Sequence, residues 1–331
     1  MTFVTDLTGL QNLSLVTSLK LLPTTVTTEQ PNMPQLTTSS PPCGKICSYE
    51  WDSKEEGIHY PLLHKVVICS DIFYRMAHSP YPVLLPPPRN PPADLLQNFT
   101  INGQCPISRF RYIDESIDSK KPASKRFNAK QFRKLMQLDN VTNINHYKDK
   151  HVLKPAFVRY KHVIDGKRVA VVGTLTPWAE AMLVNLGARS VTTIEYTKLV
   201  IEHERVSTIT PYRIAEQFVK GQATLFDTVF SYSSLEHSGL GRYGDPITPF
   251  GDLEASAQVW CMVKPGGHFI LAVPASVDRV ECSIVWNAHR VYGVARLQHL
   301  TANWRVLEEL EAMDFHKHRI FVLEKIQLTN L

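Results

Sequence analysis

Short apolar runs separated by helical patterns follow one another from residue 168 onward. The first, Arg168-Val169-Ala170-Val171-Val172-Gly173, is rich in β-branched residues and ends in glycine, as is typical of a strand buried on both faces. Further strands are predicted at 190–195, 206–210, 226–231 and 268–273. Strands that alternate with helices at this spacing predict a mostly parallel sheet with helices on both faces. Right-handed crossovers then place the strand-to-helix loops at one edge of the sheet, where ligands bind.

The segments between these strands have helical patterns. Helices are predicted at 178–186, 197–205, 211–220, 253–263 and 289–301, and closing strands at 304–310 and 319–326. Thr176 is placed to cap the first helix with Pro177 at its first position, and Gly187 closes it. Residues 264–267, Lys-Pro-Gly-Gly, predict a helix stop and a tight turn.

The 331 residues exceed one ordinary domain, and the first half has a different texture. Residues 1–45 are predicted to be a flexible tail, because residues 1–42 hold ten threonines, five prolines and few charges. Residues 46–155 are expected to form a small accessory region with helices at 62–76 and 129–138. Its segment 80–92 holds seven prolines, which favour extended backbone. Residues 156–331 are the predicted α/β domain, a Rossmann-like three-layer αβα fold with a closing antiparallel strand.

The composition of 44% hydrophobic and 20% charged residues fits a soluble globular chain. No run of 18 apolar residues is present, so no membrane-spanning helix is expected, and the first 22 residues lack the pattern of a signal peptide. Six cysteines are too few for a disulfide scaffold, and the pair Cys43 and Cys47 stands alone, so no metal site is expected. The predicted location is cytoplasmic. Glycosylation patterns keep a secretory location open, and they start at Asn12, Asn98 and Asn140.

The net charge of +5 lies entirely within residues 1–155, where 18 basic residues face 13 acidic ones. Much of the excess falls in residues 119–138, which contain no carboxylate. Such a run is typical of a polyanion site or of a solvated helix face. We favour the solvated face, because the aromatic and glycine patterns of nucleic-acid modules are missing, so nucleic acid is not an expected partner.

Two candidate ligand positions lie at the predicted sheet edge. Gly173 opens a strand-to-helix turn, where a residue without a Cβ lets backbone N–H groups approach a ligand, although it is equally suited to a plain turn. Glu195 ends the second strand, where a carboxylate can accept hydrogen bonds from ribose hydroxyls. The alternative for Glu195 is an exposed helix-capping residue.

A polar, glycine-rich loop spans residues 233–246, and long loops of this kind in α/β domains are commonly functional. His237 is the candidate general base, because the ordinary pKa of histidine lies near neutral pH. Glu236 is placed to orient it, and Arg242 to bind an acidic group or to pair with Asp245. The structural alternative is that Glu236 and His237 brace the loop. A second polar segment, 287–293, either joins the acceptor site or braces this loop. The candidate acceptor-binding residues are Tyr243, Asp245, His289, Arg290 and Tyr292.

Several of these motifs together resemble the class I S-adenosylmethionine-dependent methyltransferases. They are the strand–glycine turn–helix, Glu195 at the end of strand two, Leu235-Glu236-His237 after strand four, and the Lys264–Gly267 turn before strand five. More narrowly, residues 160–325 resemble an uncharacterised, nematode-rich family of methyltransferase-like proteins. The motifs that carry this narrower resemblance are Pro177-Trp178-Ala179-Glu180, Ile194-Glu195-Tyr196, 234–252 and 287–293.

The resemblance implies an S-adenosylmethionine cofactor. The turn at Gly173 would hold its methionine part, Glu195 its ribose hydroxyls, and the loop after strand four would face the transferred methyl group. The cofactor-binding candidates are Gly173, Thr174, Pro177, Trp178, Glu195, Tyr196 and Ser233. The catalytic candidates are His237, Glu236 and Arg242.

The leading hypothesis is a methyltransferase acting on a hydroxyl of a small molecule or glycan, with His237 removing the proton. Val171, Leu175 and Thr176 stand where that class has an acidic residue and further glycines. The alternative hypothesis is therefore a Rossmann-like binding module without catalytic activity. A nucleic-acid contact through residues 120–134 is the third, and the sequence assigns no oligomeric state.

Overall fold

The computed structural model describes residues 69–78, 86–115, 124–138, 150–196, 198–276, 280–311 and 318–326. All of these residues belong to one compact unit, Ser40–Leu331. The expected tail at 1–45, Cys43 and Cys47, and the glycosylation patterns at Asn12 and Asn140 lie outside the described residues. The described part contains no helix that is both long and apolar enough to cross a membrane.

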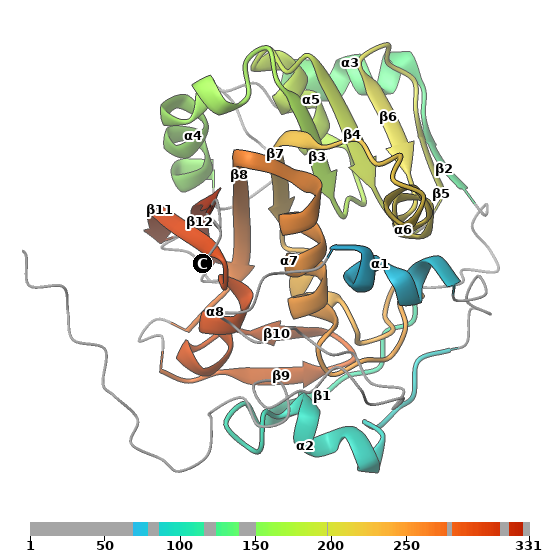
Figure 1. Ribbon diagram of the computed structural model, residues 1–331, viewed down its shortest axis with the longest axis vertical. Coiled ribbons are helices and arrows are strands. Elements are labelled where there is room, and N and C mark those ends of the chain that lie inside the picture. The colour runs from blue at the N-terminus through green and yellow to red at the C-terminus, as the bar shows by residue number, and fades with distance from the viewer. Residues whose placement is uncertain are drawn as a thin grey trace, which may run out of the picture. The chain divides into compact units, whose positions relative to one another are not determined.

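A seven-stranded sheet with the order β11-β12-β8-β7-β3-β4-β6 forms the centre of the fold (Figure 1). Its strands are β3 (Arg168–Val172), β4 (Ser190–Ile194), β6 (Val206–Ile209), β7 (Phe226–Tyr232), β8 (Val263–Pro274), β11 (Trp304–Glu311) and β12 (His318–Lys325). The five strands from β6 to β8 pair in parallel, whereas β12 runs antiparallel to β8 and β11 antiparallel to β12. The sheet therefore agrees with the expected mostly parallel sheet closed by an antiparallel strand.

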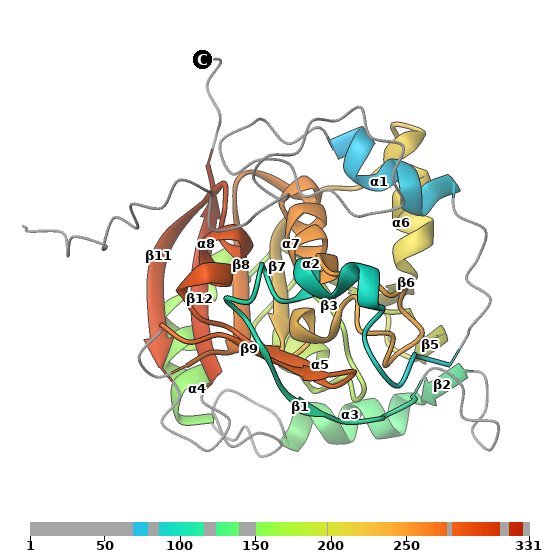
Figure 2. The ribbon, with the colours of Figure 1, turned by 90° about the horizontal axis from the view of Figure 1, so that it is seen from below.

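Helices cover both faces of this sheet, as Figure 2 shows. On one face lie α1 (Cys69–His78), α6 (Pro211–Val219), α7 (Gly251–Met262) and α8 (Val294–Leu300), and on the other α3 (Ala129–Leu138), α4 (Lys150–Arg159) and α5 (Trp178–Asn185). Successive strand residues point to opposite faces, so Val169 and Val171 belong to the core on the side of α5, whereas Ala170 belongs to the core on the side of α7. This is why the sheet strands are apolar on both sides.

Two helix starts show how local sequence sets the elements. α6 begins at Pro211, as expected, and the hydroxyl of Thr210 caps it by accepting a hydrogen bond from the N–H of Arg213 at 3.4 Å. The prediction that Thr176 caps α5 is wrong, because the helix begins at Trp178 and Pro177 occupies the N-cap without a side-chain bond. Instead, Thr174 Oγ1 donates to the Thr176 carbonyl at 2.9 Å, which tightens the turn before the helix.

The described parts of the accessory region pack onto the α/β domain. Besides α1 and α3, they contain a short 3-10 turn (Ala93–Leu95), α2 (Leu96–Phe99), β1 (Ile107–Phe110) and β2 (Ser124–Phe127). β1 pairs in parallel with β9 (Ser283–Trp286), which pairs antiparallel with β10 (His289–Val291), and β2 pairs in parallel with β5 (Lys198–Ile201). The division between residues 46–155 and 156–331 remains a prediction.

Two disulfides add covalent links between the same regions. Cys69 on α1 is bonded to Cys261 on α7, and Cys105 after α2 is bonded to Cys282 before β9. The bonds join residues 192 and 177 positions apart, so each ties the first half of the chain to the second. This pairing could not be predicted from the sequence, because the two cysteines of each bond are far apart along the chain.

Two predicted helices are wrong. Residues 198–201 form strand β5 because β2, from the first half of the chain, supplies a parallel partner, and Leu199 and Ile201 are buried on its inner side. The predicted helix 289–301 divides into strand β10 and the shorter α8. In both places long-range pairing decided the structure over local propensity. The predicted turn at 264–267 falls inside β8, and Gly266 there has φ +69°.

Within the described part of the basic run, Lys125 and Arg126 lie on β2, and Lys130, Arg133 and Lys134 lie on α3 with exposed side chains. Arg126 forms an ion pair with Glu202. A solvated face fits this arrangement, and a nucleic-acid contact remains untested.

Candidate active site

The candidate site lies where the order of the parallel strands reverses. β3 is the first strand of the α/β domain along the chain, and it lies between β4 and β7. Loops that leave neighbouring parallel strands toward opposite faces open a crevice at such a switch point. A cavity of about 380 Å³ lies at this position, and the turn after β3, the end of β4 and the loop after β7 line it. Its volume is within the range of small-molecule sites.

The turn after β3 packs closely against the loop after β7. Gly173 has φ +76°, and a β-carbon on it would overlap the side chain of Ser234. Glycine is therefore required here twice, once for its backbone conformation and once for the close approach of Ser234. The result is a narrow turn whose backbone lines the cavity.

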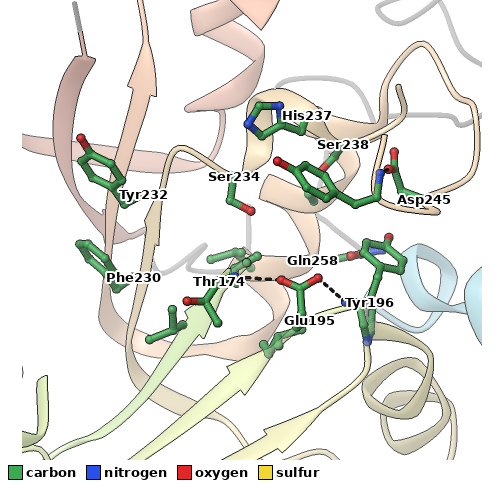
Figure 3. Close-up of a pocket in the computed structure, with 18 of the residues that line it drawn as sticks. Thr174, Glu195, Tyr196, Phe230, Tyr232, Ser234, His237, Ser238, Asp245 and Gln258 are labelled. Carbon is green, nitrogen blue, oxygen red and sulfur yellow. Dashed lines mark hydrogen bonds between the residues drawn. The ribbon is translucent and has the colours of Figure 1, made fainter. Parts of the chain in front are cut away.

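The carboxylate of Glu195 joins the ends of β3 and β4. Its Oε2 accepts a hydrogen bond from the Thr174 N–H at 2.8 Å, and its Oε1 accepts one from the Tyr196 N–H at 2.9 Å (Figure 3). Each carboxylate oxygen has a second lone pair, so the group can accept further hydrogen bonds from a ligand. Tyr196 lines the same cavity, and burial raises the pKa of its hydroxyl well above the usual value, which keeps it neutral.

One side of the cavity is apolar and is formed by helices rather than by the loops at the sheet edge. Phe73 on α1 and Ile214 on α6 line it together with Val259 and Met262 on α7. Gln258 on α7 also lines it, and its Nε2 is buried without a hydrogen-bond partner among the described residues. Phe73 and Gln258 were not predicted. A glutamine within an otherwise largely buried helix was the available signal for Gln258, whereas nothing local marked Phe73.

Large side chains in and just after the turn that follows β3 do not fill this cavity. Leu175 is half exposed at the edge, with 50% of its surface accessible. Trp178 lines the cavity but packs edge-on against Phe230 and Tyr232, with ring centroids 6.0 and 5.5 Å away. Pro177 is buried at the start of α5 and does not line the cavity. The hypothesis of a binding module with a blocked pocket is therefore not favoured.

The loop after β7 starts with a strained residue. Ser233 has φ +49°, a left-handed conformation that serine adopts rarely. Its Oγ donates to Glu236 Oε1 at 2.7 Å, and a 3-10 turn, Leu235–His237, follows. Glu236 is fully buried, and its Oε2 has no hydrogen-bond partner within the described part of the chain.

His237 comes next in the chain, and a backbone carbonyl holds its imidazole ring at one nitrogen. Its Nδ1 lies in hydrogen-bond contact with the Ala288 carbonyl, which can only accept, so the proton of the neutral ring is on Nδ1. Its Nε2 then carries a lone pair, and it lies 3.7 Å from Glu236 Oε1. Figure 3 shows His237 on the opposite side of the cavity from Glu195, with Ser234 between them. A neutral histidine in this state is equipped to accept a proton.

Asp245 organises the rest of this loop. Its Oδ2 accepts hydrogen bonds from the N–H groups of Gly239 and Gly241 at 2.7 and 3.0 Å, and its Oδ1 accepts one from Tyr243 N at 3.2 Å. Asp245, Arg242 and Tyr243 all line the cavity. Arg242 does not pair with Asp245 but with Glu115 of the accessory region at 3.1 Å, and its guanidinium lies over the Tyr243 ring at 4.9 Å.

A second cavity of about 980 Å³ opens on the other side of His237. Both cavities are lined by Ser233 and His237, whereas Glu236 and His289 line only the second. Half-burial, together with His237 nearby, lowers the pKa of His289, which favours its neutral form. The structure thus brings His237, Glu236 and His289 together, in agreement with their sequence grouping.

Arg290 and Tyr292 occupy a different place from the one expected. Both are fully buried and line neither cavity. Arg290 donates to the carbonyl of Ser238 at 2.5 Å, and Tyr292 donates to Asp252 Oδ2 at 2.9 Å. This corrects the expectation that they contact an acceptor, and it agrees with the bracing role that the sequence left open.

Asp252 is the centre of that brace. Arg296 donates to both of its carboxylate oxygens, at 2.7 and 2.6 Å, and Arg290 Nε lies 3.6 Å from Oδ1. Burial alone would raise the pKa of Asp252, but the two guanidinium groups lower it below its ordinary value. The ion cluster joins α7, β10 and α8 beneath the loop that carries His237.

Together, these features define a Rossmann-like α/β domain with a cavity at the switch point of its sheet. Residues 166–328 match the family described as "Caenorhabditis protein of unknown function, DUF268". The match confirms the resemblance to an uncharacterised, nematode-rich family that the sequence motifs indicated.

The chain is also similar to several solved structures. A 1,6-didemethyltoxoflavin-N1-methyltransferase from Burkholderia thailandensis, bound to S-adenosylhomocysteine, is 15% identical, with 52% of this chain and 77% of that chain covered and a TM-score of 0.38. TehB from Haemophilus influenzae is 15% identical over 52% of this chain and 62% of its own, with a TM-score of 0.37. The N-methyltransferase NodS from Bradyrhizobium japonicum is 13% identical over 55% of this chain and 100% of its own, with a TM-score of 0.37. No curated protein matches the chain.

Proposed function

We propose that the chain is an S-adenosylmethionine-dependent methyltransferase that methylates a hydroxyl group, with His237 as the general base. The observation that carries the proposal is the position of His237 in a wall shared by two cavities. One cavity has the features of a nucleoside site, and the other is open and polar. A base between a cofactor and an acceptor is the arrangement that group transfer to a hydroxyl requires.

The residues of the first cavity fit an adenosyl group. The carboxylate of Glu195 suits ribose hydroxyls, and the apolar side at Phe73 and Met262 suits a purine ring. Gln258 Nε2, which is buried and lacks a hydrogen-bond partner in the described chain, suits a ring nitrogen of adenine. The Gly173 turn would hold the methionine part, as the family resemblance implies, with Thr174, Tyr196 and Ser233 around it.

When bound, S-adenosylmethionine supplies the methyl group of its sulfonium, and its sulfur is the leaving group, as a neutral thioether. His237 would accept the proton of the acceptor hydroxyl, because an alcohol oxygen is a poor nucleophile until its proton is removed. The Ala288 carbonyl fixes the tautomer, so Nε2 is free to accept that proton. Glu236, with its Oε1 at 3.7 Å, would stabilise the imidazolium that results.

Arg242 and Tyr243 are proposed to shape the end of the first cavity near the transferred methyl group. Asp245 is proposed to act through them, because its carboxylate is occupied by three backbone N–H groups. Our candidate acceptor class is a carbohydrate, since the walls around His237 are polar and hold neutral hydrogen-bonding groups.

The test uses tritiated S-adenosylmethionine, the full chain, and a panel of neutral glycosides and polyols as acceptors. Wild-type protein is expected to transfer label, and His237→Gln to lower the rate by about 10²–10⁴-fold while it still binds S-adenosylhomocysteine. Full turnover in the variant would remove the base assignment. A folded wild-type protein that neither binds S-adenosylhomocysteine nor transfers label would contradict the proposal as a whole.

A further inference from the structure

The second cavity contains buried polar atoms that no protein group satisfies. Glu236 and Ser276 both line it, and Glu236 Oε2 and Ser276 Oγ are buried and have no hydrogen-bond partner among the residues that the structure describes. Buried polar atoms are normally paired, and leaving a carboxylate oxygen unpaired is costly. Two such atoms in one cavity indicate a place where a ligand supplies the missing partners.

The charge of this cavity restricts the ligand. Its described lining contains two carboxylates, Glu236 and Glu281, and neither lysine nor arginine. An anionic group, such as a phosphate or a carboxylate, would be repelled by Glu236 and would find no cationic partner there. The walls instead offer hydroxyl and imidazole groups, from Ser108, Ser276, Ser283, His289 and His318.

The same carboxylate argues against an amine as the reacting group. A buried carboxylate favours the charged ammonium form of a neighbouring amine, and an ammonium has no lone pair with which to attack. A hydroxyl has no such protonated form near neutral pH. It can donate a hydrogen bond to Glu236 or to His237 Nε2 and keep lone pairs on its oxygen.

We propose that the second cavity is the acceptor site and that it selects an uncharged molecule with neighbouring hydroxyl groups. One hydroxyl donates to His237 Nε2, and the hydroxyl next to it donates to Glu236 Oε2. The inference rests on the proposed function and adds to it the residues that recognise the acceptor. Glu236 is then an acceptor-binding residue as well as a partner of the imidazolium.

The test is acceptor binding by saturation-transfer NMR on the full chain with S-adenosylhomocysteine present. The probes are a methyl hexopyranoside, the matched methyl hexuronide, which carries a carboxylate, and the matched methyl 2-amino-2-deoxyhexoside. We expect the neutral glycoside to bind, and the other two to bind at least about tenfold more weakly. We expect two substitutions, Glu236→Gln and Ser276→Ala, each to weaken binding of the neutral glycoside by about tenfold. Glu236→Gln does so because it replaces an accepting oxygen by a donating nitrogen.

Glu281→Gln is the matched control, because it removes an exposed carboxylate from the same cavity wall. Its glycoside affinity should stay within about twofold of wild type. Equal losses in Glu281→Gln and Glu236→Gln, or tighter binding of the hexuronide, would overturn the inference. Calorimetry with S-adenosylhomocysteine on the same samples distinguishes a failure of the acceptor-site inference from a failure of the proposed function. Cofactor binding without glycoside binding overturns only the acceptor site, whereas absent cofactor binding overturns the proposed function.

The two disulfides carry a second, independent inference. In the described chain every cysteine is in a disulfide, and both bonds join segments that are remote in sequence. Their Cα atoms lie 5.5 and 4.7 Å apart, which suits a disulfide. Stable disulfides of this kind are rare where glutathione keeps thiols reduced. We infer that the chain matures in an oxidising compartment, the secretory alternative that the sequence left open.

The test maps cysteines in the full chain expressed in eukaryotic cells that are lysed in denaturant with N-ethylmaleimide. We expect Cys69, Cys261, Cys105 and Cys282 to resist labelling until a reductant is added, and to appear as two linked peptide pairs. Complete labelling of these four cysteines without reductant would overturn the inference. Cys282→Ala is the internal control, because it should expose Cys105 to labelling and leave the Cys69–Cys261 pair intact.

Discussion

The side chain of Ser234 lies directly against the α-carbon of Gly173, so that a β-carbon on Gly173 would overlap it. This contact joins the turn after β3 to the loop that carries His237. The shape of the first cavity and the position of the loop that carries His237 therefore depend on the same pair of residues.

We predict that Gly173→Ala abolishes S-adenosylhomocysteine binding. Alanine at φ +76° costs about 1–2 kcal/mol of backbone strain, and its methyl group also displaces Ser234. Gly221→Ala is the matched control, because Gly221 has φ +65° but open space around it. It should show the loss of thermal stability alone, with normal binding in calorimetry. Equal binding by both variants would contradict the predicted role of the turn.

Glu180 on α5 gives a pH-dependent prediction. It is buried with Oε1 accepting a hydrogen bond from Thr193 Oγ1 at 2.7 Å, and burial raises its pKa from 4.5 to about 7. Between these two values the folded chain holds more protons than the unfolded chain. The contribution of Glu180 to stability is thus complete below pH 4.5 and is lost as the pH rises through 7.

Glu180→Gln mimics the protonated side chain and should remove this dependence. At pH 8 the variant is expected to be more stable than wild type by up to about 3 kcal/mol, with no difference below pH 4.5. Urea unfolding across this range measures the difference. Glu204→Gln, at an exposed position, should leave the slope unchanged. An unchanged slope in Glu180→Gln would show that Glu180 does not cause it.

The buried cluster around Asp252 gives a prediction for stability. Asp252→Asn leaves Arg290 and Arg296 buried without their counter-charge, and it should cost about 3–5 kcal/mol in the free energy of unfolding. Because the pKa of Asp252 is lowered, its contribution is present at neutral pH and is lost in acid. The surface pair Arg213–Glu216 provides the control, since Glu216→Gln should cost at most about 0.5 kcal/mol. A similar small loss in Asp252→Asn would contradict the bracing role.

Gln258 provides a prediction for cofactor affinity. Gln258→Leu removes a buried amide nitrogen that has no hydrogen-bond partner in the described protein, so the fold should keep or gain stability while S-adenosylhomocysteine binds about tenfold more weakly. Gln222→Leu changes an exposed glutamine in the same way and should alter neither property. Unchanged affinity in Gln258→Leu would show that Gln258 does not contact adenine.

The sequence predicted the elements whose signals are local. The β-branched run at Arg168–Val172, the cap and proline of α6 and the glycine after α5 each specify structure within a few residues. β5 could not be predicted, because its strand state depends on β2, more than seventy residues away along the chain.

The same distinction holds at the site. That Gly173, Glu195 and His237 lie at one cavity could be predicted, because sheet topology alone places the ends of parallel strands together. Phe73 was missed because only the packing of α1 on α6 and α7 brings it to the cavity, and Arg290 was misplaced because a rim segment does not reveal which side chains turn inward.

The most direct test of the account is calorimetric titration of S-adenosylhomocysteine into the full chain and into Glu195→Gln. We predict saturable one-to-one binding to the wild type and at least about tenfold weaker binding to the variant, since Gln offers fewer accepting lone pairs than the carboxylate. Absence of binding heat with folded wild-type protein, or equal affinity in the variant, would contradict the claim that Gly173 and Glu195 form a nucleoside site.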